Sequence, residues 1–538
     1  MSRDTSATAR TARVRQKIQG QQSDGGVQLN KDGSHWLQKR LGRTIFFNQT
    51  LNGVTTDVPC ACIYATDTES IVVTGSFFGT ATFNNADGSA GATLTATDFE
   101  DAFVVKYNLS GVVQWATKIG SAVIDVGRSV AIDNEKNIIA VGYFNSTATF
   151  YNPDGSTGAT LTDISGVDAY VVKYNSSGVV QWATKIRSDG EDEAFAVAID
   201  SSNNIVVTGE FGDTATFFNS DESTGATLTD ISNDDVFVVQ YNSLGFVQWA
   251  TKIRSVDYES SYSVANDSSN NIVVTGVFQN TATFFNSDGS SGGTLTDISN
   301  EDVFVVQYNS LGFVQWATKI RSVDYESSFG VAIDSSNNIV VTGEFEDVAT
   351  FFNSDGSSGA TLTTTGGYDA YVVQYNSSGF VQWTTQIGSV NSDRGRSVTI
   401  DSLNNIVVTG EFRATATFFN SDGSSGATLT VASGDDGFVV KYNSLGFVQW
   451  VTKIETAGSD DGGIGIANDS ANNIIVTGNF NSIATFYDSN GVSSGKTVTA
   501  TGDDNRYLVK YNASGFVQWA LVAGQTAGNE IGKSIAVR

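Results

Sequence analysis

The segment Phe246–Ile253, FVQWATKI, decides the fold, because close copies of it recur through most of the chain. Its tryptophan has counterparts at a nearly constant spacing of about 67 residues, and only the last of them comes slightly later than this period. These residues are Trp115, Trp182, Trp249, Trp316, Trp383, Trp450 and Trp519. A fixed period of this length indicates one structural unit repeated in tandem, and such units fold by stacking on each other.

One copy of the unit spans residues 195–253 and contains four strand-like runs, which we label A, B, C and D. They are 195–200, 205–211, 236–241 and 246–253. Their Val, Ile, Phe, Tyr and Thr content is typical of strands, and short Ser/Asn/Gly turns join A to B and C to D. A longer insert separates B from C. At 351–363 and 418–430 this insert has the same sequence, with an Asp-Gly centre that predicts a β-hairpin.

Four consecutive antiparallel strands, repeated around an axis, make the blades of a β-propeller. The sequence therefore predicts an all-β fold: a single propeller of four-stranded blades of about 67 residues, each with a hairpin insert. A blade must bury its second face against a neighbour. We therefore expect the seven tryptophans of the D strands to fill the contacts between blades.

The repeat resembles the SBBP-type β-propeller repeat family. The residues that carry the resemblance are an N-x-V-x-V-T-G-x-F strand, a D-x-F-V-x-K-Y strand and a following G-x-x-x-W. In one copy these are Asn204–Phe211, Asp235–Tyr241, and Gly245 with Trp249. Equivalents recur over residues ~60–538. The resemblance implies a propeller and no single activity.

Seven complete A–D sets begin near Cys60 and end near Trp519. Ser534–Val537 looks like one more A strand, and Val27–Trp36 resembles a degraded C–D pair. Strands from both termini are therefore expected to close the ring. Seven blades is the preferred count, and eight, with one composite blade, is the alternative.

These observations predict three parts: a flexible basic arm at 1–26, a divergent partial blade or closure segment at 27–59, and the propeller at 60–538. Residues 1–43 hold nine Lys/Arg and three Asp/Glu. A flexible tail is the simplest interpretation of the arm. A transit peptide and a segment that docks onto an assembly are the alternatives.

The chain has a formal net charge of −27, and the part after residue 43, with 21 Lys/Arg and 54 Asp/Glu, carries −33. A body this acidic repels phosphate backbones, so no nucleic-acid partner is expected for the propeller. No apolar run approaches membrane-spanning length, and the N-terminus lacks an apolar signal core. A virion or another surface-exposed assembly is the favoured location, and the cytoplasm is the alternative.

Several kinds of catalytic chemistry have no candidate residues. His35 is the only histidine and lies before the repeats, so a Ser–His–Asp triad within them is excluded. Cys60 and Cys62 are interpreted as structural thiols. We therefore expect no enzyme activity, no catalytic residue, no cofactor and no metal site. Structural Ca²⁺ on the Asn- and Asp-rich turns is a minor alternative.

The D–A loops and the B–C inserts share one face of such a propeller, and the D–A loops differ between copies. Varied loops on a rigid scaffold are where recognition usually occurs, although they are also explained as solvated connectors. The predicted binding residues are Asp192, Asp257, Tyr258, Glu259, Asp324, Tyr325 and Glu326. Glutamates also follow the B-strand glycine in three copies, at 210, 344 and 411. They would make a central channel acidic, but simple tolerance of this position is the preferred interpretation.

The sequence thus predicts a non-enzymatic binding or structural propeller, displayed on a surface or built into a large assembly such as a virion. It would recognise a protein or glycan partner through its D–A loops and B–C inserts. A carbohydrate-active hydrolase on a propeller scaffold and an intracellular scaffold for protein complexes are the alternatives.

Overall fold

The computed structural model divides the chain into two compact units, Met1–Thr68 and Glu69–Arg538. It describes residues 69–538 except 164–165, 231–233, 298–300, 457–461, 501–504 and 525–529, together with four short strands before them. These are β1 (Val27–Leu29), β2 (His35–Leu37), β3 (Phe47–Leu51) and β4 (Val54–Val58), which pair as β1–β2 and β3–β4. The predictions about Cys60, Cys62 and the arm 1–26 lie outside the described residues, and the role of 27–59 in closure stays a prediction.

Four sheets of the second unit have six strands each. The first contains, in order, β11 (Thr157–Thr162), β10 (Thr147–Tyr151), β7 (Val113–Gly120), β6 (Ala90–Asn108), β5 (Ser70–Asn84) and β42 (Glu530–Val537). The second contains β17 (Thr224–Thr229), β16 (Thr214–Phe218), β13 (Val180–Arg187), β12 (Asp168–Tyr174), β9 (Ile138–Phe144) and β8 (Asp125–Ile132). The third contains β14 (Asp192–Ile199), β15 (Ile205–Phe211), β18 (Asp235–Tyr241), β19 (Val247–Arg254), β22 (Thr281–Phe285) and β23 (Ser291–Thr296). The fourth contains β20 (Glu259–Asn266), β21 (Ile272–Phe278), β24 (Asp302–Tyr308), β25 (Val314–Arg321), β28 (Val348–Phe352) and β29 (Ser358–Thr363).

Two further sheets complete the unit. A ten-stranded sheet contains β26 (Glu326–Ile333), β27 (Ile339–Phe345), β30 (Asp369–Tyr375), β31 (Val381–Gly388), β33 (Ile406–Phe419), β34 (Ser425–Tyr442), β35 (Val448–Thr456), β38 (Ile483–Tyr487) and β39 (Ser493–Thr499), with β32 (Arg394–Ile400) paired to β33. A four-stranded sheet contains β36 (Gly462–Asn468), β37 (Ile474–Phe480), β40 (Asn505–Tyr511) and β41 (Val517–Val522). The ten-stranded sheet is continuous because β33 and β34 are long enough to form both inner strands and the hairpin that pairs with β31.

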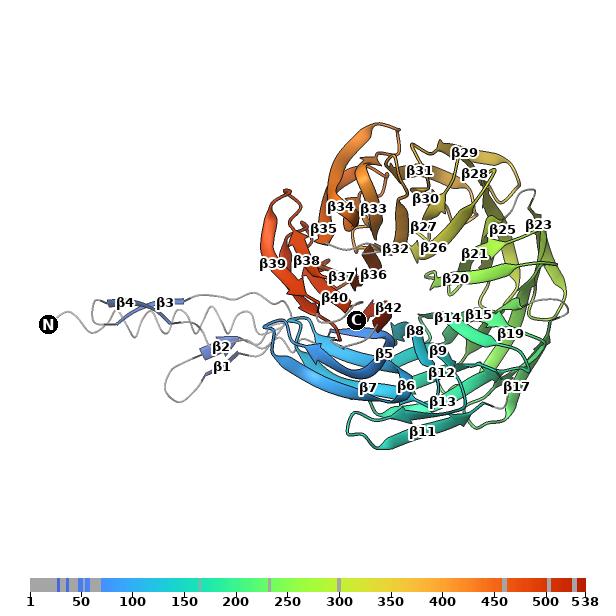
Figure 1. Ribbon diagram of the computed structural model, residues 1–538, viewed down its shortest axis with the longest axis horizontal. Coiled ribbons are helices and arrows are strands. Elements are labelled where there is room, and N and C mark those ends of the chain that lie inside the picture. The colour runs from blue at the N-terminus through green and yellow to red at the C-terminus, as the bar shows by residue number, and fades with distance from the viewer. Residues whose placement is uncertain are drawn as a thin grey trace. The chain divides into compact units, whose positions relative to one another are not determined.

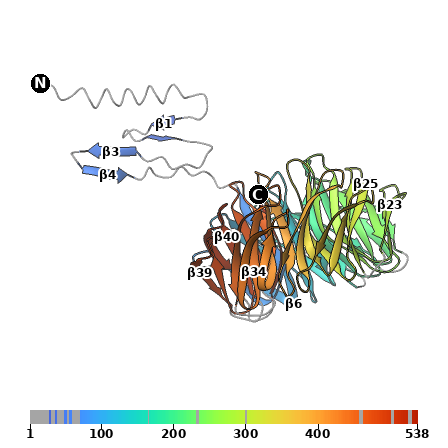
Figure 2. The same cartoon turned by 90° about the horizontal axis from the view of Figure 1, so that it is seen from above.

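The sheets stand around a common axis, with β8, β14, β20, β26, β32, β36 and β42 innermost (Figure 1). Figure 2 shows the same unit from above, with its strands running side by side through its depth. This confirms the predicted all-β propeller. No helix among the described residues is long and apolar enough to cross a bilayer.

The local sequence of each repeat explains its strands and turns. Residues of β15 and β18 are buried almost throughout, which fits β-branched and aromatic strands covered on both faces. The turn between β14 and β15 depends on Asp200, whose carboxylate accepts the N–H groups of Ser202 and Asn204, both at 2.8 Å. Asn203 takes the left-handed conformation there (φ 63°), which Asn tolerates better than most residues.

The B–C insert forms the predicted hairpin, but its partner strand belongs to the preceding repeat. Hairpin β16–β17 pairs with β13, through Ile186 opposite Phe217 and Arg187 opposite Thr216. Each six-stranded sheet therefore ends in two strands supplied by the next repeat. This exchange is why four-stranded repeats give six-stranded sheets.

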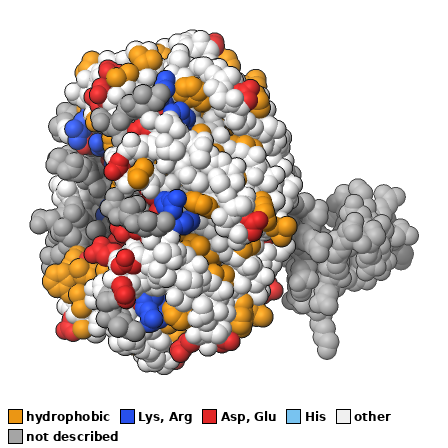
Figure 3. All heavy atoms as spheres, turned by 90° about the vertical axis from the view of Figure 1, so that its right-hand side faces the viewer, with side chains coloured by type: hydrophobic (Ala, Val, Ile, Leu, Met, Phe, Trp, Pro, Cys, Tyr) orange, Lys and Arg blue, Asp and Glu red, His pale blue; other side chains and the backbone are white. Residues whose placement is uncertain are grey.

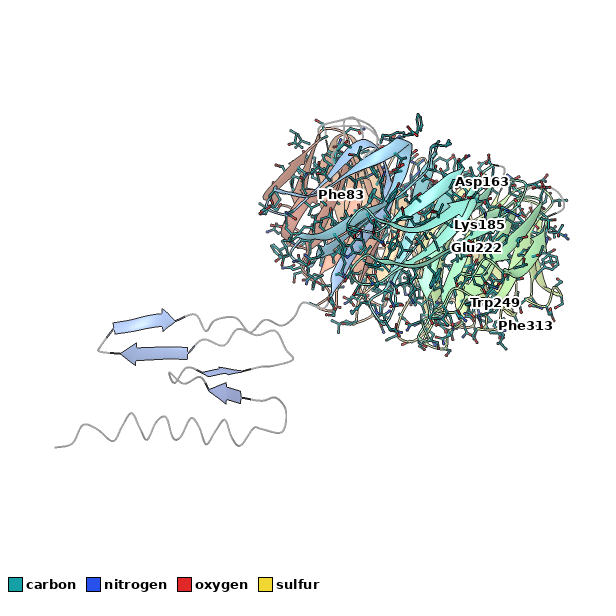
Figure 4. All side chains as sticks on the ribbon, turned by 90° about the horizontal axis from the view of Figure 1, so that it is seen from below. Phe83, Asp163, Lys185, Glu222, Trp249 and Phe313 are labelled. Carbon is teal, nitrogen blue, oxygen red and sulfur yellow. The ribbon has the colours of Figure 1, made fainter. Side chains whose placement is uncertain are left out.

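The repeating tryptophans lie where one repeat meets the C–D turn of the next. Trp249 Nε1 donates to the carbonyl of Ser310 at 3.1 Å, and its ring lies against Gly312. Figure 4 shows Trp249 and Phe313 at the same end of the unit. Trp249 is half-buried. The tryptophan contact is thus polar as well as apolar.

We predict that Gly379→Ala destabilises the protein more than Gly356→Ala. Both glycines have left-handed backbones (φ +77° and +82°), so both variants incur the same local strain. A Cβ on Gly379 would lie 2.8 Å from both the Trp316 ring and the Ser354 Cβ, whereas one on Gly356 would meet nothing within 4 Å. The expected difference in the free energy of unfolding is about 1–3 kcal/mol. Denaturant unfolding of the two variants measures it, and equal losses would contradict the proposed role of the tryptophan contact.

Candidate functional site

The D–A loops and the starts of the B–C inserts lie at one end of the strands. Asp192 at the start of β14 and Asp235 at the start of β18 both pair with Phe211 at the end of β15. We call this end the D–A face. Its described D–A loops are 121–124, 188–191, 255–258, 322–325 and 389–392.

The seven predicted binding residues separate into two groups at this face. Asp257, Tyr258 and Asp324 are exposed, with Tyr258 at 44%, and Tyr325 is half-buried. Asp192, Glu259 and Glu326 are buried instead, with at most 2% of each residue exposed. Binding by any of them stays a prediction, but only the first group can touch a partner without rearrangement of the fold.

The buried acids hold the loops that present the exposed residues. Glu259 accepts the N–H of Ser255 at 2.9 Å and also the hydroxyl of Ser255. The Tyr258 carbonyl accepts the N–H of Gln279 at 2.8 Å. These bonds fix both ends of the loop, so Val256, Asp257 and Tyr258 project from a rigid base.

Each of these acids also faces a second buried carboxyl group. Glu259 interacts electrostatically with Asp235, and Glu326 interacts with Asp302. Two neighbouring carboxyl groups away from water repel each other when both are ionised, which favours a proton on one of them. Burial, the largest cause, raises the pKa of Glu259 and of Glu326 above the usual range.

A lysine lies beside most of these pairs. Lys319 contacts Asp302 at 2.7 Å and Lys252 contacts Asp235 at 2.7 Å. One lysine neutralises the charge of one of the two carboxylates. The other carboxyl group is therefore neutralised by a proton. In the Asp369–Asp393 pair, Gln386 replaces the lysine, and burial raises the pKa of both aspartates to about 7. Sequence reasoning missed this recurring pair, although an acid begins the C strand and the A strand in five consecutive repeats.

A second feature missed by sequence reasoning is an arginine network on the inner strands. Arg394 bridges Glu344 (2.6 Å) and Glu411 (2.8 Å), and Arg396 also contacts Glu411 at 3.0 Å. Two of the three glutamates that follow the B-strand glycine are therefore paired with arginines. The third, Glu210, has different surroundings.

The exposed surface of the D–A face combines carboxylates with apolar tips. Three D–A loops carry strongly exposed valines: Val256 (64%), Val323 (66%) and Val390 (74%). Tyr325 meets the ring of Tyr368 edge-on at 5.7 Å. The exposed acids at this end are Asp98, Asp189, Glu191, Asp213, Asp234, Asp257, Asp324 and Asp347. Figure 3 shows acidic and basic side chains together on the left of the view, with single acidic side chains scattered over an otherwise mainly uncharged surface.

The turn aspartates are used within their own turns. Asp288 accepts the N–H (2.9 Å) and hydroxyl (2.5 Å) of Ser290, and these hydrogen bonds lower its pKa. Within the part of the chain that the structure describes, no three His, Cys, Asp or Glu side chains form a group that could hold a metal ion.

Part of the repeat region matches the model of a known protein family. The model of the family described as "Beta-propeller repeat" (SBBP) matches residues 382–411, which include Trp383 and the following A and B strands. The chain carries the SBBP repeat. The suspected resemblance is therefore confirmed, and the match lies within the periodic part of the sequence.

Among curated proteins, an "Uncharacterized WD repeat-containing protein L264" of Acanthamoeba polyphaga mimivirus is 30% identical over 484 residues. The alignment covers 79% of this chain and 34% of that protein, so the chain spans about a third of its relative's length.

Two solved structures also align with this chain. One is a protein of unknown function from Bacteroides caccae, with a TM-score of 0.27 and 10% identity, covering 61% of this chain and 97% of that one. The other is the WD40 β-propeller domain of Doa1, with a TM-score of 0.25 and 11% identity, covering 65% and 88%. Because both scores are low, the fold rests on the strand pairing described above.

We predict that acidification stabilises the propeller. The paired carboxyls hold protons in the folded state and ionise near pH 4 when unfolded, so the folded state binds more protons between that pH and their raised pKa values. The free energy of unfolding should therefore fall as pH rises from about 5 to about 9.

Glu326→Gln mimics the protonated acid and should reduce this pH dependence by about 1–3 kcal/mol. Denaturant unfolding at several pH values measures it. Asp324→Asn removes a charge from the same loop at an exposed position and is the control. The same pH dependence in Glu326→Gln as in the unaltered protein would refute protonation of Glu326 in the folded state.

Proposed function

We propose that this chain is a non-enzymatic binding propeller that holds a basic protein partner on its D–A face, within a large assembly such as a virion. The observation that carries the proposal is the combination of exposed tyrosine, valine and carboxylate side chains on loops held by buried hydrogen bonds. Tyrosine offers apolar area with a polar tip, and it is enriched among residues that dominate binding energy.

Charge favours a basic protein over other partners. The exposed acids of the D–A face would attract a positively charged surface and increase its association rate. A neutral glycan would gain nothing from this charge. A glycan partner is therefore the alternative outcome of the binding experiments.

Two observations support a structural role over catalysis. The carboxyl pairs recur in successive repeats and are buried, whereas a hydrolase needs one differentiated, accessible pair. The mimivirus relative is named for its repeats. Its viral source supports, by analogy alone, the proposal that this chain is a virion component.

We also propose that the propeller has seven blades and is closed by β42. In support, β42 pairs with β5, from Glu530 opposite Phe77 to Val537 opposite Ile71. Trp519 Nε1 donates to the carbonyl of Leu109 at 3.1 Å, which is the tryptophan contact of the other repeats carried from the last to the first.

Removal of residues 530–538 should expose the edge of β5 and destabilise the protein by several kcal/mol, since an unpaired edge strand also favours aggregation. Thermal unfolding and light scattering measure both effects. An unchanged melting temperature in the shortened chain would contradict closure by β42.

The binding face is tested with the partner found by cross-linking the native assembly. The double variant Tyr258→Ala/Tyr325→Ala should weaken that interaction at least about tenfold, or about 1.4 kcal/mol, without changing the melting temperature. Leu244→Ala/Leu311→Ala is the matched control, because these leucines are 65% and 66% exposed on C–D turns at the opposite end. Equal affinity in the tyrosine variant, or loss only in the leucine variant, would reject the D–A face. Isothermal titration calorimetry gives the affinities.

A further inference from the structure

The innermost strands carry a bulge whose extra residue contributes to the inner lining of the propeller. The strand register shifts around Phe195, Tyr262, Phe329 and Arg396. These residues contact their counterparts on neighbouring strands. Tyr262 meets Phe329 at 6.0 Å, and the Arg396 guanidinium lies 4.7 Å from the centre of the Phe329 ring. Bulged residues of successive repeats therefore lie side by side around the axis.

One place on this lining shows how the protein itself binds a guanidinium. Phe329 stacks with Arg396, while Glu344 pairs with Arg394 at 2.6 Å. Glu411 contacts both arginines. Aromatic faces and carboxylates together are a favourable environment for a desolvated cation.

The corresponding place two repeats earlier in the chain lacks both arginines and one of the two glutamates, because Val277 replaces Glu411. Phe195 replaces Phe329, and Glu210 replaces Glu344. Ser260 and Tyr262 stand where Arg394 and Arg396 stand. The truncation from arginine to serine removes the guanidinium that would neutralise Glu210, and the tyrosine adds a second aromatic ring.

Glu210 is left with acids as its main charged neighbours. The Ser260 hydroxyl donates a hydrogen bond to the Glu210 carboxylate. The Oε1 atom of Glu210 is buried and has no hydrogen-bond partner in the described part of the chain. Glu193, Asp234 and Glu259 all act on it as like charges. Arg128, on the preceding inner strand, is paired with Glu193 at 2.8 Å and stacks on Phe195. Burial, as the largest cause, raises the pKa of Glu210 to about 7.

We propose that Glu210, with Phe195 and Tyr262, is a receptor for a cationic side chain, a guanidinium or an ammonium group, which the partner supplies in addition to Arg128, the cation that already pairs with Glu193 and stacks on Phe195. The cation takes the place that the Arg394 side chain occupies two repeats later, because Ser260 leaves this position short while Tyr262 fills the position of Arg396. Glu210 supplies the carboxylate, and the two aromatic rings supply faces that favour a desolvated cation. The inference rests on the proposed function and deepens it by naming the chemistry that the partner inserts along the axis.

Propylguanidine is a suitable probe, with the uncharged propylurea as its matched neutral compound. Ligand-observed NMR titration of the full chain should show saturable binding of propylguanidine and none of propylurea. Glu210→Gln should weaken binding at least about tenfold. Ser260→Arg, which restores the arginine found at 394, should abolish it by filling the site.

Glu222→Gln removes one carboxylate from an exposed hairpin tip and should leave binding unchanged. Melting temperatures of all variants show whether each is folded, and Ser260→Arg keeps the test decisive if Glu210→Gln does not fold. The proposal is overturned if the unaltered chain binds no propylguanidine, or if both site variants bind it as the unaltered chain does. The propylguanidine titration contains no partner protein. It can therefore give a negative result while the tyrosine variants still uphold the D–A face, and the reverse can also occur.

Discussion

The structure depends on one constraint that every repeat shares. No single repeat can bury its own apolar faces and strand edges without its neighbours. Each repeat supplies its hairpin to the edge of the preceding sheet, as β16–β17 does for β13. It also supplies the C–D turn on which the preceding tryptophan lies, as Ser310 and Gly312 do for Trp249. Folding free energy is therefore held between repeats as much as within them, as is general for tandem arrays.

The same arrangement explains why polar groups are buried so regularly. At the starts of the C and A strands, carboxyl groups from neighbouring sheets meet away from water, as Asp302 and Glu326 do. Leaving both ionised would cost more than one lysine recovers, so protonation accompanies burial. The buried acids order the D–A loops, because they accept hydrogen bonds from the backbone N–H groups of these loops. A surface able to bind a partner is thus supported by groups that the partner never touches.

Variation between near-identical repeats is the source of any specificity. Two positions that hold Arg394 and Arg396 in one repeat hold Ser260 and Tyr262 in another. The backbone is the same at both places, yet one lining is neutralised internally and the other is acidic. Duplication supplies the scaffold, and a few substitutions at projecting bulge positions distinguish one segment of the lining from another.

The sequence by itself determined the repeat, its strands and its fold class. The B strand predicted at 205–211 is β15 with the same ends, and the insert is a hairpin. These features follow from local preferences of β-branched side chains and of Asp, Asn and Gly turns, which are written in neighbouring residues. The exposure of Asp257 and Tyr258 followed from loop composition in the same way.

Only the tertiary structure decided which residues meet across repeats. It paired each hairpin with the preceding D strand, and it buried Asp192, Glu259 and Glu326, which the sequence had placed on an exposed binding loop. It also brought Arg394 to Glu344, fifty residues earlier in the chain. Such contacts depend on how successive sheets are stacked, and a constant period fixes the repetition without fixing which side chains of two copies face each other.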